Sequence, residues 1–360
     1  MRSFMSTGRL LLSALSATLV VVACGSTSTP PAAVDVGSGA LTGAGATFPA
    51  PFYQKAFFDY SAKYSQVTVN YQAVGSGAGI QQFIKNTVDF GASDVPMGAT
   101  DIASAGGDSS LTQVPTTLGV ISIAYNLSGV DKLQLDADSL AGIFLGHIKK
   151  WNDPTLTALN PGVSLPGTAI TVVHRSDGSG TTFHFTDYLS KVSPEWKSSV
   201  GNAKSVKWPV GVGASGNQAV AQGVTSTAGA IGYVELAYVV QTGMHQAYLK
   251  NAAGKFVQAS VDGATAAAGT NTNVSPTNYS ITNASCDACY PIAGFSWLIL
   301  RTSYTDAAKG RAVVYLVKWL VTDGQSDGAS LQYEPLPSAV GQLALSNLKL
   351  VKAGGSAVVS

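Results

Sequence analysis

Short strand-like runs alternate with helical segments along most of this chain, and that alternation limits its possible folds more than any other feature. Residues 118–125 and 170–174 are continuous apolar runs, which are typical of strands buried on both faces. Residues 51–64 instead place Phe52 and Tyr60 on one face of a helix. Strands separated by helices predict α/β layers around largely parallel sheets. A length of 360 residues is enough for two domains.

The same patterns predict further elements. Strands are expected at residues 67–71, 88–93, 229–234 and 296–300, a helix at 307–322, and a hairpin turn at 251–254 between strands 248–249 and 256–257. The stretch 259–290 is rich in Ala, Thr and Asn, and its pattern supports no assignment.

The N-terminal segment has the pattern of an export signal. Arg2 and Arg9 lead into an uncharged, mostly apolar run at residues 10–23, which is shorter than the roughly 20 residues of a membrane-spanning helix. The run ends in VVACG, which resembles the lipobox of bacterial lipoproteins, where Cys24 would be lipidated and become the mature N-terminus. An ordinary secretory signal with a chance cysteine is the alternative. We therefore expect residues 1–23 to be a lipoprotein signal peptide.

A flexible tether is expected to follow. Residues 24–40 are rich in Ser, Thr, Pro and Gly and show no hydrophobic periodicity. The folded part is therefore expected to begin at Leu41.

The charge balance excludes two classes of protein. Charged residues make up 11% of the chain, and 21 basic side chains face 20 acidic ones. Removing residues 1–23, which hold two basic residues and no acidic one, changes the formal charge from +1 to −1. Such a chain lacks the basic face of a nucleic-acid-binding protein, and its 46% hydrophobic content excludes a disordered polyelectrolyte.

Four segments share one design, in which a strand end is followed by small residues and the start of a helix. They are 42–51 (TGAGATFPAP), 75–79 (GSGAG), 89–94 (DFGASD) and 174–183 (HRSDGSGTTF). Free N–H groups and the positive dipole end of a helix N-terminus attract anions without any net charge. Glycine allows a close backbone approach, hydroxyls donate hydrogen bonds, and Arg175 offers a planar charged fork to a tetrahedral oxyanion. Each segment alone is more often a capped turn, but their repetition favours an anion site.

Other kinds of site lack the spacing that they need. A dinucleotide-binding fingerprint would require glycine where Ile80 or Phe48 stands. Neither a GxxxxGK[ST] phosphate loop nor a GxSxG nucleophile elbow occurs, so Ser76 and Ser179 are poor candidate nucleophiles. The four histidines show no metal-ligand spacing, and those near Ser179 are expected to be structural. We expect neither a cofactor nor a metal.

Cys286 and Cys289 form a CxxC motif in a polar loop just before Pro291. A zinc site would need two further ligands, and a thioredoxin-type motif would open a helix. In an exported protein a local disulfide is favoured over free thiols or a metal.

The four segments and three further stretches resemble the phosphate-binding lipoproteins of bacterial phosphate ABC transporters, the PstS type. The matching stretches are LTGAGATFPAP, YQAVGSGAG, NTVDFGASDVPM, HRSDGSGTTFHFT, LAGIFLGHIKKWNDP, VKWPVGVGASGN and AGAIGYVELAYV. They cover most of residues 41–320, in order. The resemblance implies an α/β, two-lobe periplasmic-binding-protein fold of type II-like topology, with the ligand in the interlobe cleft. Residues 41–117 plus 292–360 would form lobe I, and residues 118–291 would form lobe II.

The resemblance also implies which residues bind phosphate. They are Thr47, Phe48, Ser76, Asp94, Arg175, Ser179, Gly180 and Thr181. Asp177 would pair with Arg175 and hold its fork in place. After Ser76 the chain reads Gly77-Ala78-Gly79, where family members often carry Ser-Gly-Gly, so one hydroxyl at the edge of the site would be missing.

Asp94 would accept a hydrogen bond from the ligand. A carboxylate can form a hydrogen bond with an anion only if the anion carries a proton. Near neutral pH phosphate carries at least one proton, whereas sulfate carries none. Facing sulfate, the carboxylate would find no donor and would be repelled. We therefore predict that the site binds phosphate and rejects sulfate.

The predicted function is a non-enzymatic receptor that captures phosphate by hinge closure and delivers it to the permease of an ABC transporter. We expect a monomer without a nucleic-acid partner, anchored through Cys24 to a bacterial membrane in the periplasm or at the cell surface. One alternative is a phosphatase or other hydrolase on the same lobes, for which we find no nucleophile, metal cluster or base. Another is a binding protein for a different oxyanion, such as arsenate or molybdate.

Overall fold

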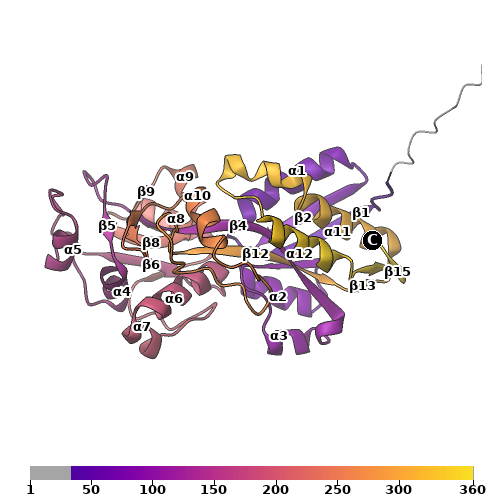
Figure 1. Cartoon of the computed structure of the whole chain (residues 1–360), viewed down its shortest axis with the longest axis horizontal. Coiled ribbons are helices and arrows are strands. Elements are labelled where there is room, and N and C mark those ends of the chain that lie inside the picture. Colours follow the sequence, from indigo (N-terminus) through magenta and orange to yellow (C-terminus); the bar gives the residue numbers. More distant parts are fainter. Residues whose placement is uncertain (1–33, 360) are drawn as a thin grey trace, which may run out of the picture. The chain divides into compact units, whose positions relative to one another are not determined.

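The computed structural model describes residues 34–359, and the chain from Val36 onward forms one compact unit (Figure 1). Its strands are β1 Gly39–Gly45, β2 Val67–Ala73, β3 Phe90–Ser93, β4 Leu111–Tyr125, β5 Gln134–Leu135, β6 Thr171–Arg175, β7 Val212–Ala214, β8 Ala230–Glu235, β9 His245–Gln246, β10 Tyr248–Lys250, β11 Phe256–Val257, β12 Ala293–Arg301, β13 Ser303–Tyr304, β14 Lys352–Ala353 and β15 Ser356–Ala357.

Helices connect most of these strands. The α-helices are α1 Ala50–Lys63, α2 Ser76–Ile84, α3 Ala99–Ser104, α4 Ala137–Leu145, α5 Pro154–Leu159, α6 Gly180–Val192, α7 Pro194–Ser199, α8 Gly216–Ser226, α9 Leu236–Thr242, α10 Val261–Ala268, α11 Ala307–Leu320 and α12 Ser338–Leu348. Three 3-10 helices are η1 Asp108–Ser110, η2 Asp323–Asp327 and η3 Ala329–Leu331. None of the helices in residues 34–359 is long and apolar enough to cross a membrane.

One mixed sheet organises the described chain. Its strands follow the order β2-β1-β3-β12-β4-β8-β6-β7, and β9 also pairs with β4. We call β1–β3 with helices α1–α3, α11 and α12 the β1 end, and β6–β8 with helices α4–α10 the β6 end. In Figure 1, β4 and β12 run side by side from one end to the other.

The direction of the strands differs from the prediction of largely parallel sheets. Within the β1 end and the β6 end the neighbours are parallel, but β12 is antiparallel to β3 and to β4, and β4 is antiparallel to β8. The chain leaves the β1 end along β4 and returns to it along β12, so these two neighbouring strands run in opposite directions. Continuous apolar runs do not reveal strand direction, because burial on both faces is the same in either case.

Strand β4 belongs to both ends of the sheet. All of its residues are buried; residues 111–120 pair with β12, whereas residues 121–125 pair with β8. The register with β12 shifts between Ser296 and Trp297, opposite Pro115. Proline has no N–H to donate, so inside a central strand it is tolerated at an irregularity of this kind.

Most predicted elements are confirmed, with shifted ends. Helix α1, strands β2, β6 and β8 and helix α11 lie where the pattern placed them, and β10 and β11 form the predicted antiparallel hairpin. The strand predicted at 118–125 is the second half of the longer β4, and the one predicted at 88–93 begins only at Phe90. The unassigned stretch contains α10.

The folded chain begins before Leu41. Val36 is buried, and Gly39 and Ala40 already pair with Val67 and Thr68 of β2. The tether predicted over residues 24–40 therefore extends too far. Gly39 and Ala40 belong to β1, which is held beside β2 by backbone hydrogen bonds, and such pairing leaves no hydrophobic pattern in the sequence.

Candidate functional site

The four predicted segments meet at one place in the structure. Each lies at the end of a strand, β1, β2, β3 or β6, and three of them open the helices α1, α2 and α6. Three of the segments come from the β1 end, and the segment that follows β6 approaches them from the other end of the sheet.

Ser76 joins the two ends of the sheet at this point. Its Oγ accepts hydrogen bonds from the Asp94 N–H and from the Gly180 N–H, both at 3.2 Å. The same hydroxyl donates to Asp94 Oδ2 at 3.3 Å. Beside it, the Gly77 N–H donates to the Gly178 carbonyl at 2.8 Å. The β1 and β6 ends are therefore in direct contact.

Glycine is required where the two ends touch. A Cβ on Gly180 would lie 2.4 Å from Asp94 Cβ, and a Cβ on Gly75 would lie 2.2 Å from Asp177 Oδ2. Gly75 also has a φ of +94°, a conformation that side chains strongly disfavour. A side chain at either position would hold the two ends apart.

Asp94 is almost completely buried in this contact, with 1% of its surface exposed. Ser296 Oγ of β12 donates to Asp94 Oδ1 at 2.7 Å. Burial raises the pKa of Asp94 to about 7, although the hydrogen bond from Ser296 and the charge of Arg175 act in the opposite direction. The carboxyl can therefore exist with or without its proton near neutral pH.

Arg175 is held in a fixed orientation by Asp177, the pairing that the family resemblance implied. Its Nε donates to Asp177 Oδ1 at 2.6 Å, and its Nη2 donates to Asp177 Oδ2. Burial acts to raise the pKa of Asp177, but the hydrogen bonds and charge of Arg175 outweigh it, and the pKa is lowered. The third nitrogen, Nη1, points to Thr181 Oγ1 at 3.4 Å. The Arg175 N–H itself donates to Tyr233 OH at 3.0 Å.

The start of α6 uses some of its predicted donors within the protein. The Ser179 hydroxyl accepts from the Thr182 N–H at 3.0 Å as a helix cap, and the Ser179 N–H donates to the Lys204 carbonyl. The Gly180 N–H donates to Ser76. The Thr181 N–H lies in the first turn, where no intrahelical acceptor exists.

Asn217 is a site residue that the sequence reasoning missed. Its N–H and its Nδ2 donate to Thr47 Oγ1 at 3.2 and 3.0 Å, and Nδ2 also donates to Thr181 Oγ1 at 3.0 Å. Both hydroxyls accept from Asn217, so each keeps its own proton to donate elsewhere. The signal was available, because Asn217 follows a glycine at the start of α8, in a stretch that matches the family.

Two other contacts of Asp94 were also missed. Ser296 is a polar residue inside an apolar strand, which could have marked it as unusual. His184 of α6 donates from Nε2 to the Asp94 carbonyl at 2.9 Å. Burial lowers the pKa of His184 to about 4, so the ring is neutral and Nε2 carries its proton.

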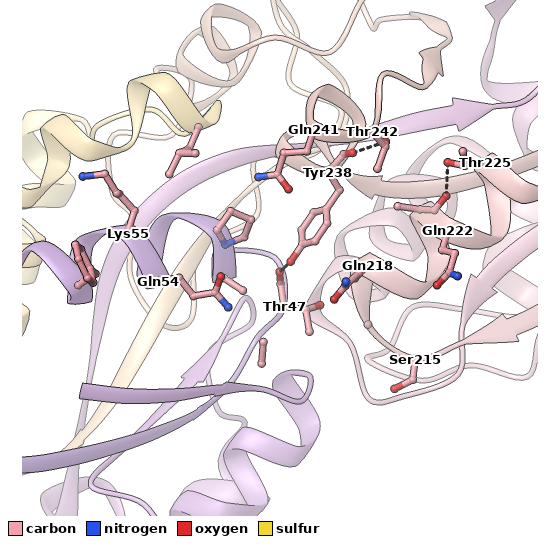
Figure 2. Close-up of a pocket in the computed structure, with 17 residues that line it drawn as sticks. Thr47, Gln54, Lys55, Ser215, Gln218, Gln222, Thr225, Tyr238, Gln241 and Thr242 are labelled. Carbon is pink, nitrogen blue, oxygen red and sulfur yellow. Dashed lines mark hydrogen bonds between the residues drawn. The ribbon is translucent and has the colours of Figure 1, made fainter. Parts of the chain in front are cut away.

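A groove with both polar and apolar walls opens beside Thr47. It has a volume of ≈ 1020 Å³ and lies between α1 on one side and α8 and α9 on the other. Figure 2 shows Tyr238 pointing across it to Thr47, and the Tyr238 hydroxyl donates to the Thr47 carbonyl at 2.6 Å. Uncharged amides line much of its wall, namely those of Gln54, Gln218, Gln222 and Gln241.

The CxxC motif is a disulfide, as predicted, with Cys286 and Cys289 bonded to each other. Asn251 Nδ2 donates to the carbonyls of Cys286, Asp287 and Cys289 at 2.9 to 3.1 Å. The proposed lipidation site, Cys24, lies outside the described residues. Within residues 34–359, no group of three or more His, Cys, Asp or Glu side chains is arranged to hold a metal ion.

Comparison with known proteins agrees with this geometry. A family model described as the PBP superfamily domain matches residues 30–320. The phosphate-binding protein PstS of Xylella fastidiosa strain 9a5c is 44% identical over 317 residues, covering 87% of this chain and 86% of its own length. PstS of Pasteurella multocida is 44% identical over 307 residues, covering 83% of this chain and 87% of its own.

The chain belongs to the PstS family of the PBP superfamily. Solved structures share its fold: a human phosphate-binding apolipoprotein has a TM-score of 0.71 at 21% identity, covering 89% of this chain and 100% of its own. A phosphate-binding protein from Stenotrophomonas maltophilia has a TM-score of 0.64 at 20% identity, covering 86% of this chain and 94% of its own. The expected two-lobe α/β fold of a PstS-type protein is confirmed.

Proposed function

We propose that this chain is an extracytoplasmic receptor that binds inorganic phosphate and delivers it to the permease of an ABC transporter. The observation that carries this proposal is the buried contact of Ser76 with Asp94 and Gly180 between the two ends of the sheet, where the charge of Arg175 also acts on Asp94. It combines a fixed guanidinium, hydroxyl donors and a carboxyl group that can accept a proton.

Each predicted binding residue has a proposed role in this contact. The Thr47, Ser76, Ser179 and Thr181 hydroxyls, the Arg175 guanidinium and the Phe48, Gly180 and Thr181 N–H groups would donate to phosphate oxygens. Those N–H groups and hydroxyls that now bond within the protein would exchange these bonds for bonds to the anion. Asp94 would accept from the phosphate hydroxyl, which gives the site its preference for a protonated anion.

The hinge of this receptor is proposed to lie in the two strands that connect the ends of the sheet. Strand β4 changes partner between Val120 and Ile121, and Ile121 donates to the Ile292 carbonyl just before β12. In this proposal lobe I comprises residues 41–117 plus 292–360, and lobe II comprises residues 118–291. Rotation there would open the contact at Ser76 while leaving both halves of the sheet intact.

The remaining expectations are part of the same proposal. Cys24 would be lipidated and would hold the receptor at a bacterial membrane. The protein would act without catalysis, since the site offers phosphate no activated nucleophile. Incubation with p-nitrophenyl phosphate tests this last point, and turnover that depends on Ser76 or Ser179 would contradict it.

Isothermal titration with phosphate and with sulfate tests the binding proposal. We expect tight phosphate binding and no measurable sulfate binding by the wild-type protein. Asp94→Asn should narrow the difference between the two anions, because an amide can donate to an unprotonated oxygen. Asp108→Asn, on an exposed turn, serves as the matched control. Equal binding of both anions by the wild-type protein would refute the proposal.

A further inference from the structure

The Tyr333 hydroxyl lies within hydrogen-bond distance of two acceptors but has one proton to donate. Tyr333 OH lies 2.6 Å from the Phe48 carbonyl oxygen and 2.8 Å from Glu235 Oε2. A carbonyl and a carboxylate can only accept, and the phenol has one proton. If Glu235 is protonated, it donates to Tyr333 and Tyr333 donates to Phe48, so that both short contacts are hydrogen bonds.

The surroundings of Glu235 favour the protonated form. The residue is completely buried, and its second oxygen, Oε1, has no hydrogen-bond partner among the described residues. Burial, aided by the charge of Asp94, raises the pKa of Glu235 well above its ordinary value, against hydrogen bonds from Tyr333 and from the N–H groups of Ala237 and Leu236. The other titratable group that faces it is Tyr238 of α9, whose own pKa Glu235 raises and Arg175 lowers.

This hydrogen-bond chain ends on the loop that is proposed to bind phosphate. The Phe48 carbonyl belongs to the turn between β1 and α1, which carries the Thr47 and Phe48 N–H groups. The Glu235 N–H also donates to Asn217 Oδ1 at 3.1 Å, which orients the amide that donates to Thr47. Glu235 at the end of β8 is thus connected to Thr47 and Phe48 by two separate routes.

We propose that Glu235 is a positioning residue that works as a neutral acid, donating to Tyr333 so that the Tyr333 hydroxyl fixes the Phe48 carbonyl and the anion-binding turn. The part of this inference that concerns ligand affinity rests on the proposed function. The protonation state of Glu235 can be measured independently of it.

Infrared spectroscopy tests the protonation state. At pH 8 the Asp94→Asn protein should show the carbonyl band of a protonated carboxyl group, which disappears when Glu235→Gln is added. The Asp94→Asn background removes the other buried carboxyl of raised pKa from the spectrum. Adding Glu195→Gln, an exposed carboxyl on α7, should leave the band in place. If Glu235→Gln removes only carboxylate bands, the proposal is overturned.

Phosphate titration tests the positioning role. Tyr333→Phe keeps the ring packing against Phe48 and Phe52 but removes the hydroxyl, and we expect about tenfold weaker binding. Glu235→Leu should weaken binding to a similar degree, and the double variant should be no worse than either single one, because both break one chain. Glu235→Gln can donate to Tyr333 but can no longer accept from the Ala237 N–H, which bonds to Glu235 Oε2 at 2.8 Å, so its affinity should fall between those of the wild type and Glu235→Leu. If the affinity losses of Tyr333→Phe and Glu235→Leu add up in the double variant, the two residues do not act through one hydrogen-bond chain and the proposal is contradicted. If the wild-type protein does not bind phosphate at all, the proposed function is refuted instead. Thermal melts identify any variant that fails to fold, and in that case the infrared result decides.

Discussion

Asp94 is a carboxyl group held away from water, and its burial has a cost that depends on pH. Its pKa is about 7 in this structure, compared with roughly 3.9 for an unfolded aspartate. The folded chain therefore keeps a proton that the unfolded chain has already lost. The stability that this proton provides is complete below about pH 4 and is lost as the pH rises to about 7.

Asp94→Asn should remove this pH dependence. We expect the variant to melt at the same temperature as the wild type at pH 4, but at a higher temperature at pH 8, by an amount equivalent to a few kcal/mol at most. Differential scanning calorimetry without phosphate or sulfate measures both values. Asp108→Asn should show no such difference between the two pH values, and an equal gain in that variant would contradict the explanation.

The sequence pattern marked the four segments that meet in the structure, but not the contacts between them. Gly75, Gly180 and their neighbours were found because small residues at a strand end are a local pattern. Asn217, Ser296 and Glu235 were not assigned to the site: local signals were present for Asn217 and Ser296, but the partners of all three residues are far away in the chain. Ser296 and Asp94, for example, are separated by 202 positions, and no local pattern encodes that pairing.

At the scale of elements, the two ends of the sheet touch where Gly180, the first residue of α6, packs against Asp94, which directly follows β3. Gly180→Ala would place a methyl group 2.4 Å from Asp94 Cβ. We expect it to weaken phosphate binding by up to about a hundredfold while the melting temperature changes little, because each end of the sheet can still fold. Titration calorimetry measures the affinity. Gly341→Ala in α12, where a methyl group meets no atom within 4 Å, is the control and should bind like the wild type.

The disulfide loop supports the fold at a distance from the anion site. Cys286 and Cys289 close a very short loop, so Cys286→Ser with Cys289→Ser should lower the free energy of unfolding by only about 2 kcal/mol. Phosphate affinity should not change, since Asn251 continues to hold the loop carbonyls. Urea unfolding and titration test the two statements separately, and a large loss of affinity would show that the loop acts on the site.

Across the whole molecule, the family resemblance predicted what the residue pattern could not. The pattern indicated α/β layers but assigned no strand directions. The discontinuous lobe I that the resemblance implies would depend on β12 returning beside β3 and β4, which is a long-range pairing. The pairing of Gly39 and Ala40 with β2 was missed for the same reason, since backbone hydrogen bonds and not apolar side chains hold these two residues.

Hinge closure is a prediction at this scale. Small-angle X-ray scattering of the wild-type protein should give a smaller radius of gyration with phosphate than without it. Gly180→Ala should keep the larger value in both conditions, since its methyl group prevents the ends from meeting. A radius that is the same with and without phosphate in the wild type would contradict rotation about β4 and β12.

The place of β12 between β3 and β4 also sets an order of events during synthesis. Strand β3 emerges from the ribosome roughly 200 residues before β12, its antiparallel neighbour. Until β12 is made, the β1 end lacks the strand that joins β3 to β4, whereas β6, β7 and β8 are already present with their helices. The part of the chain translated in the middle can therefore fold first, and the part translated at the beginning must wait for the end of the chain to complete its sheet.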